Sequence, residues 1–241
     1  MSNKNGAIVW KDTAKNISFV LTGLERASSN VKTGGMIQSY VMRNDMNPNE
    51  AIKTGKDESI CGNCPLRGDG TGKDRSCYVT MIHGPGSVYR GMDNYSGNLE
   101  DIKGKPLRLG SYGDTAFVPI SVLNKLVKLA SKITGYSHQF RNKSKQAYKK
   151  FLMASVETLA GKKEANKLGW RTFRIINNVK DLQEDEVLCP ASKEMGHKLT
   201  CERCGMCNGN LTGRKKNIAI VGHGSPVSAG RNIKKYITSV S

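Results

Sequence analysis

The sequence contains no apolar run long enough to cross a bilayer, and it is poor in acidic residues. A membrane-spanning helix needs about 18 consecutive apolar residues, and no segment of the 241-residue chain reaches that length. The N-terminal residues 1–6 also lack the apolar stretch and small-residue cleavage site of a secretory leader. We therefore expect a cytoplasmic protein that does not enter a membrane. A hydrophobic fraction of 37% and a charged fraction of 24% indicate a globular chain, which we expect to form a single domain over residues 1–241.

The 20 acidic residues are outnumbered by 38 lysines and arginines, so the formal net charge is +18. Such an excess attracts polyanions, and nucleic acid is the commonest polyanion in a cytoplasm. The composition predicts nucleic acid as a partner, while a generally basic surface without a dedicated groove is the alternative. An anionic membrane fits less well, because no predicted helix opposes a strong apolar face to a basic one. Two basic clusters stand out: Lys143, Lys145, Lys149 and Lys150, and then Arg214, Lys215 and Lys216.

The seven cysteines form two groups, and their odd number excludes a complete set of internal disulfides. The second group contains two overlapping Cys-x-x-Cys units within residues 189–207: Cys189, Cys201, Cys204 and Cys207. Gly205 and Gly209 allow the turns that bring successive thiolates toward one centre. Four thiolates suit Zn²⁺ or an iron–sulfur cluster such as [4Fe–4S], and the alternative is a set of buried, inert cysteines.

The first group, within residues 61–77, supplies three thiols: Cys61, Cys64 and Cys77. A metal with three protein ligands keeps one coordination position free, as a catalytic metal requires. A structural zinc completed by His83 or Asp69 is the second interpretation. A composite site built from both cysteine groups is the third.

Hydrophobic periodicity predicts strands that alternate with helices. Short apolar runs predict strands at residues 7–10, 17–21, 106–111, 136–140, 151–156, 170–176 and 217–221. Helices are predicted from Pro119 to Gly135 and at residues 143–150, 159–167 and 229–239. Residues 24–60 are polar and weakly periodic, and only a loop at 27–35 is assigned there. This alternation favours an α/β fold of parallel βαβ units, specifically a whole or partial (β/α) barrel into which the cysteine-rich segments are inserted.

In such a barrel the functional residues lie at the C-terminal ends of the strands. The polar residues predicted there are Ser111, Tyr112, Asp114, His138, Gln139, Ser155, Glu157, Arg174 and His223. We consider three of them as candidate catalytic residues: Asp114, His138 and Glu157. Asp114 can bind a cofactor amine or act as a base, or it caps the helix that begins near Pro119. His138 is a ligand, a proton shuttle or a hydrogen-bonded strand-end residue, and Glu157 faces either the barrel mouth or solvent.

Several short strings together resemble a group of bacteriophage proteins of uncharacterised function, the gene product 88 family. They are Thr33-Gly-Gly-Met-Ile-Gln-Ser, Cys61-Gly-Asn-Cys64, Cys77-Tyr78, Arg108-Leu-Gly-Ser-Tyr-Gly-Asp114, Gly135-Tyr-Ser-His138, Met153-Ala-Ser155, Gly169-Trp-Arg-Thr-Phe-Arg174 and Cys189-Pro-Ala-Ser. The resemblance covers residues 30–225 approximately and implies a phage protein that acts in the host cytoplasm.

The layout is also similar, at a distance, to the radical S-adenosylmethionine enzymes. That similarity implies a partial (β/α) barrel in which Cys61, Cys64 and Cys77 hold a [4Fe–4S] cluster whose fourth iron binds S-adenosylmethionine. It implies cofactor contacts from the segment Gly110, Ser111, Tyr112, Gly113 and Asp114, and an auxiliary cluster or a zinc ion on the four-cysteine group. The chain departs from the usual Cys-x-x-x-Cys-x-x-Cys motif, because twelve residues separate Cys64 from Cys77.

Two main hypotheses follow. The first is a phage-encoded iron–sulfur enzyme that acts on or with nucleic acid. The second is a zinc-stabilised nucleic-acid-binding protein without catalysis, used in phage replication or host takeover. An inhibitor of a host enzyme, for which the positive charge is incidental, is a third idea.

Overall fold

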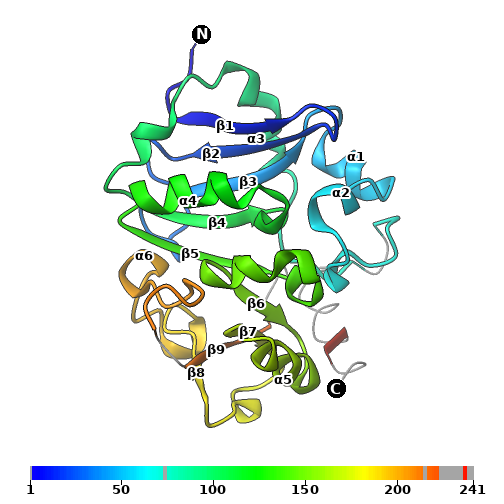
Figure 1. The fold of residues 1–241 in the computed structure, drawn as a ribbon, viewed down its shortest axis with the longest axis vertical. Coiled ribbons are helices and arrows are strands. Elements are labelled where there is room, and N and C mark those ends of the chain that lie inside the picture. The colour runs from blue at the N-terminus through cyan, green and yellow to red at the C-terminus, as the bar shows by residue number, and fades with distance from the viewer. Residues whose placement is uncertain (1, 73–74, 214–215, 223–235, 238–241) are drawn as a thin grey trace.

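A single nine-stranded sheet runs through the chain (Figure 1). The computed structural model describes residues 2–72, 75–213, 216–222 and 236–237. The strand order is β1-β2-β3-β4-β5-β6-β7-β9-β8, so β1 and β8 are the two edges. The strands are β1 (Gly6–Asp12), β2 (Ile17–Thr22), β3 (Ile37–Arg43), β4 (Pro106–Tyr112), β5 (Lys132–Ser137), β6 (Met153–Val156), β7 (Thr172–Ile176), β8 (Glu186–Leu188) and β9 (Asn217–Val221).

The pairs β1–β2 and β2–β3 are antiparallel, and from β3 onward every neighbouring pair of strands is parallel. The α/β class with a mostly parallel sheet is therefore as predicted. The described strands do not close into a ring, so the prediction of a whole barrel is wrong. The open sheet is compatible with the predicted partial barrel, which stays a prediction. Closure would require β8 to pair with β1, whereas each of these strands has one neighbour in the sheet.

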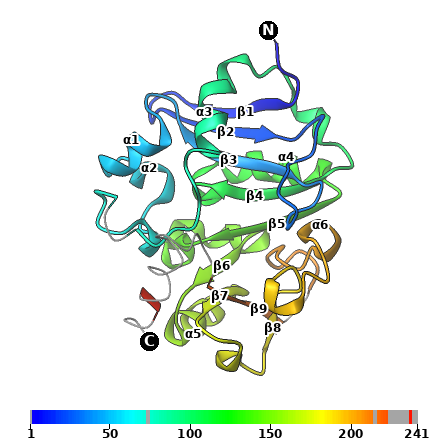
Figure 2. The ribbon, with the colours of Figure 1, turned by 180° about the vertical axis from the view of Figure 1, so that it is seen from behind.

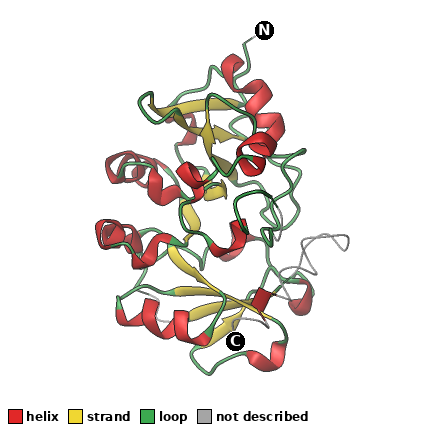
Figure 3. Cartoon of the chain, turned by 90° about the vertical axis from the view of Figure 1, so that its right-hand side faces the viewer, coloured by secondary structure: helices red, strands yellow, loops and turns green. Residues whose placement is uncertain are grey.

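Three crossover segments cover one face of the parallel strands. They are α4 (Ile120–Leu129), the 3₁₀ segment η6 (Lys143–Lys150) and α5 (Leu159–Lys167). They lie in front of the sheet in Figure 1, and the edge-on view of Figure 3 shows helices in a column along one side. Leu123 and Leu126 of α4 are fully buried against this face. At the centre of the layer, the Trp170 indole is 1% exposed and donates to Gln146 Oε1 at 2.9 Å.

The remaining helices are short and lie in the connections. They are α1 (Pro48–Lys53), α2 (Glu58–Cys61), α3 (Pro85–Gly91) and α6 (Cys201–Cys204). Short 3₁₀ turns are η1 (Pro65–Arg67), η2 (Met92–Asn94), η3 (Leu99–Ile102), η4 (Thr115–Phe117), η5 (Gln139–Arg141), η7 (Val179–Asp181) and η8 (Lys193–Met195). The view from behind shows α1 and α2 at one side and α6 beside β5 (Figure 2). None of the described helices is both long and apolar enough to cross a membrane.

Most predicted elements lie where the sequence placed them, and the exceptions have physical causes. The strand β3 was missed because it carries Gln38 and Ser39, which are buried by hydrogen bonds rather than by apolar character. The helix predicted to reach Gly135 ends at Leu129, and Ile133 belongs to β5 instead. The strand predicted at residues 136–140 is therefore observed earlier in the chain, as β5. His223, Arg214, Lys215 and most of the helix predicted at 229–239 lie outside the described residues.

Candidate functional site

Alternate side chains of the parallel strands line two neighbouring cavities on the face opposite α4 and α5. On β4 these are Arg108, Gly110 and Tyr112, two residues apart, because side chains of a strand alternate between its faces. The larger cavity measures about 270 Å³ and the smaller about 120 Å³. Four residues border both cavities: Tyr78, Tyr136, Phe173 and Ile175. The rings of Tyr136 and Phe173 are 4.2 Å apart between centroids and form part of the common wall.

The smaller cavity contains the first cysteine group, at the C-terminal ends of the strands. Cys61, Cys64 and Cys77 all border it, on the segment between β3 and β4. Cys61 ends α2, and Cys64 precedes η1. Gly62 between them has φ 59°, and a Cβ there would lie 2.7 Å from the Gln139 amide, so the turn between the two thiols requires glycine.

An arginine fixes the loop that carries these thiols. The Arg67 guanidinium donates to both oxygens of Asp57, at 3.0 and 2.7 Å, and to the Gly62 carbonyl at 3.0 Å. The Gln139 side chain donates to the Cys61 carbonyl at 3.2 Å from the end of β5. Neither His83 nor Asp69, the predicted alternative ligands, borders the cavity. The three thiols are therefore presented from a rigid loop to a common space.

The thiols influence one another's ionisation. Burial raises the pKa of Cys61 well above its usual range, and the neighbouring Cys64 and Cys77 raise it further. Burial also raises the pKa of Cys77, although Arg75 opposes that shift. Clustered, buried thiols resist losing their protons to water because each thiolate repels the others. A cation that binds several of them removes this repulsion.

The three candidate catalytic residues come together beside the cysteines. Asp114 Oδ2 accepts from the Ser137 hydroxyl at 3.0 Å and from the His138 backbone N–H at 2.8 Å. Its Oδ1 accepts from the Ala116 N–H at 2.9 Å, so it caps η4 rather than α4. Burial raises the pKa of Asp114 despite these donors.

His138 stands between a thiol and a carboxylate. Its Nε2 lies 2.8 Å from Glu157 Oε1, and Cys64 is close enough to act on its charge. Burial lowers the pKa of His138, but Cys64 and then Glu157 outweigh burial and raise it well above its usual value. Glu157 is buried behind His138 and does not border the cavity, so the solvent-facing alternative for it is wrong.

The predicted cofactor segment forms another wall of the smaller cavity. Gly110, Ser111, Tyr112, Gly113 and Asp114 all border it. Gly113 has φ 70°, and a Cβ there would lie 2.7 Å from the Val41 carbonyl. The Ser111 hydroxyl is used by Gln38, to which it donates at 2.8 Å. The buried Tyr112 hydroxyl, in contrast, has no hydrogen-bond partner within the described part of the chain.

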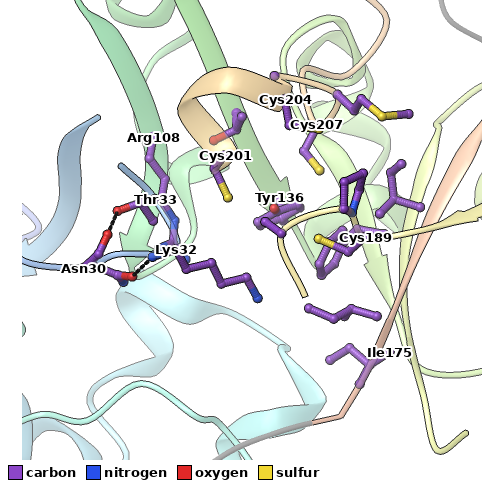
Figure 4. Close-up of a pocket in the computed structure, with 18 of the residues that line it drawn as sticks. Asn30, Lys32, Thr33, Arg108, Tyr136, Ile175, Cys189, Cys201, Cys204 and Cys207 are labelled. Carbon is purple, nitrogen blue, oxygen red and sulfur yellow. Dashed lines mark hydrogen bonds between the residues drawn. The ribbon is translucent and has the colours of Figure 1, made fainter. Parts of the chain in front are cut away.

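The larger cavity contains the second cysteine group. Cys189 follows β8, Cys201 and Cys204 begin and end α6, and Cys207 follows a turn at Gly205 with φ 59°. Figure 4 shows the sulfurs of Cys189, Cys201 and Cys207 turned toward the space beside Tyr136. The Cys207 carbonyl accepts from the Gly135 N–H at 2.8 Å, which attaches the segment to β5.

Positive side chains surround this second group. Lys32 and Arg108 border the larger cavity, and Figure 4 shows Lys32 reaching into it. Burial raises the pKa of Cys201, while Arg108 and Lys32 oppose that shift. No hydrogen bond or ion pair joins the Arg108 guanidinium to another described residue, and its nearest polar neighbours include Tyr78, Tyr136 and Cys201. Lys32 and Arg108 were not predicted as site residues, although the alternation of β4 places Arg108 on the same face as Tyr112.

The thiols border cavities rather than converging on one point. Across the ranges that the structure describes, no group of three or more histidine, cysteine, aspartate or glutamate side chains is arranged to hold a metal ion. One predicted strand-end residue, Arg174, also lies elsewhere. It pairs with Glu186 on the opposite face of the sheet, at 2.7 and 2.6 Å.

No protein-family model matches the chain, and no curated protein or solved structure matches it either. The resemblances drawn from the sequence therefore stay predictions, and the geometry of the two cavities is what supports a function.

Proposed function

We propose that this chain is an iron–sulfur enzyme with two clusters on the inner face of a partial (β/α) barrel. The observation that carries the proposal is the smaller cavity, where Cys61, Cys64 and Cys77 border one space together with His138. Three thiolates leave one iron of a [4Fe–4S] cluster without a protein ligand. The cavity lies at the C-terminal ends of parallel strands, the usual place for chemistry in α/β folds.

The space that the thiols border leaves room for a cluster. A tetrahedral Zn²⁺ draws its thiolates to about 2.3 Å from one point. The described cysteines border cavities of about 270 and 120 Å³. An iron–sulfur cluster binds each thiolate through a different iron, and so it needs open space between the sulfurs.

The positive side chains beside the four-cysteine group are consistent with a negatively charged metal centre there. A half-buried guanidinium without a counter-charge is costly, and Arg108 has none among the described residues. Four thiolates around a cluster carry net negative charge and would supply it. Lys32 adds a second positive charge at the same cavity. We assign the four-cysteine group to an auxiliary cluster that remains closed to substrate.

At the open site we propose S-adenosylmethionine as the cofactor, on the strength of the resemblance. A cluster held by these thiols would supply one-electron reduction chemistry to such a cofactor, with the electron coming from an external reductant. The chain's own residues would hold the cofactor: the Tyr112 hydroxyl lacks a partner, and the segment from Gly110 to Asp114 borders the same space. His138, held by Glu157 at 2.8 Å, is placed to carry a proton.

The test is to purify the protein without oxygen and to measure iron, sulfide, zinc and the visible spectrum. We expect a brown protein with about eight iron and eight sulfide ions, as two [4Fe–4S] clusters require. The double substitution C61A/C64A should remove half of both. The matched control D69A/H83A changes potential ligands that do not border the cavity and should retain all of the iron.

Two results would overturn parts of the proposal. A colourless protein with about two zinc ions would replace the enzyme with the zinc-stabilised binding protein. An intact cluster that never cleaves S-adenosylmethionine under reducing conditions would leave an iron–sulfur protein but remove the proposed cofactor.

A further inference from the structure

The part of the chain that contains the three crossover segments, together with β5 and β6, carries half of the chain's net charge. Residues 115–170 contain eleven lysines and arginines but only two acidic residues, Glu157 and Glu164. Neither carboxylate is free, because Glu157 is buried against His138 and Glu164 pairs with Arg141 at 2.7 Å. Lys162 is buried and paired with Asp185, but most of the other positive side chains of this segment are exposed or half-buried.

Six of these lysines are exposed and make no ion pair within the described residues. Each of the three crossover segments supplies two of them. They are Lys125 and Lys128 of α4, Lys143 and Lys150 of η6, and Lys163 and Lys167 of α5. Since neighbouring packed helices lie about 8–10 Å apart, the six lysines extend over roughly 20 Å across the layer. The segments that carry them lie on the front of the molecule in Figure 1.

We propose that this strip, the lysines 125, 128, 143, 150, 163 and 167, binds the phosphate backbone of nucleic acid. A duplex carries one charge per about 1.7 Å of its axis, so a 20 Å strip faces several phosphates at once. Lysines on flexible stems suit phosphate contacts that carry no sequence information. The proposal does not depend on which metal the cysteines bind, because the strip lies on the face opposite both cavities.

Two other polyanionic partners fit this face less well. A membrane-surface helix buries an apolar face in the lipid, but the apolar faces of α4 and α5 point into the protein core through Leu123, Leu126 and Ala165. An acidic peptide is usually held in a groove that reads its side chains, and the cavities described above are lined by other elements. Exposed lysines on three successive crossover segments match a regular, rigid polyanion.

The experiment compares two triple charge reversals of equal total charge. K125E/K143E/K163E changes one strip lysine in each crossover segment. K4E/K11E/K53E changes exposed lysines that also lack ion pairs but lie outside the strip, near β1 and on α1. Binding of a fluorescent 20-base-pair DNA duplex and the matching RNA duplex is followed by anisotropy over a range of KCl concentrations. Thermal melting confirms that both variants are folded.

We expect the strip variant to lose at least about a hundredfold in affinity at 0.1 M salt, and its plot of log K against log salt to be shallower by about three. The control should bind within a few-fold of the original chain. If both variants lost the same amount of affinity, the overall charge of the protein would explain the binding, and the proposal would be overturned. Binding to vesicles of anionic lipid but to neither duplex would overturn it in favour of a membrane surface.

Discussion

His138 Nε2 and Glu157 Oε1 lie 2.8 Å apart, and both side chains are largely shielded from solvent, with His138 bordering the three-thiol cavity and Glu157 behind it. The strands that carry them, β5 and β6, are neighbours in the sheet, so the pairing of two strands brings these residues together. Glu157 fixes the orientation of the His138 ring through this contact, and Cys64 lies close enough to act on the charge of the ring.

We therefore expect Glu157→Leu to lower the free energy of unfolding by about 1–3 kcal/mol, because a buried imidazole loses its partner. Glu157→Gln keeps a hydrogen-bonding group and should cost less. Denaturant unfolding of both variants checks the stability, and iron content after anaerobic purification checks the site. An unchanged iron content in the Leu variant would show that orientation of His138 is irrelevant to the thiols.

Replacing Arg108 should affect the stability of the metal-free protein and of the iron-loaded protein differently. In the metal-free chain the guanidinium has no counter-charge among the described residues, so Arg108→Met should be neutral or stabilise by about 1 kcal/mol. In the iron-loaded protein the same change removes a cation beside an anionic cluster and should lower the melting temperature. The exposed Arg90→Met is the control and should have little effect in either form. Identical shifts with and without iron would contradict this role.

Gly113 and Gly104 form a matched pair for testing the cofactor segment. Both have φ near 70°, but a Cβ at Gly113 would meet the Val41 carbonyl at 2.7 Å, whereas a Cβ at Gly104 would meet nothing within 4 Å. Gly104→Ala should cost about 1–2 kcal/mol from backbone strain alone. Gly113→Ala should cost more and disturb the adjacent Asp114. Equal unfolding energies for the two variants would mean that the backbone near Val41 moves freely.

Arg174 and Glu186 should matter for stability and not for metal binding. They form a buried, two-pronged pair on the face away from the cavities, with Arg174 4% and Glu186 5% exposed. Arg174→Met alone should cost about 3–5 kcal/mol because Glu186 is left buried, and R174M/E186M should recover much of that loss. Urea unfolding measures both, and the iron content should remain that of the original chain. A loss of iron in the double variant would place Arg174 in the functional site after all.

The missed and misplaced elements show where local patterns fail. In α4 the apolar spacing continues past Leu129 to Ile133, so periodicity alone extends the helix. The chain instead pairs Ile133 with Leu107 of β4, and that long-range pairing decides where the helix ends. Similarly, β3 is central in the sheet and hides its polar side chains by hydrogen bonds with residues far along the chain, such as Ser39 with Gly110.

The sequence by itself determined the α/β class, the segments β7, α5 and β9, and the two groups of cysteines, because periodicity and residue spacing are local properties. It also identified Asp114, His138 and Glu157 as strand-end residues. Only the tertiary structure decided that the sheet stays open, and that each cysteine group borders its own cavity with a common wall of Tyr136 and Phe173. It also decided that Arg108 joins the four-cysteine group while Arg174 faces the other way, because those outcomes depend on strand order and on which face each residue occupies.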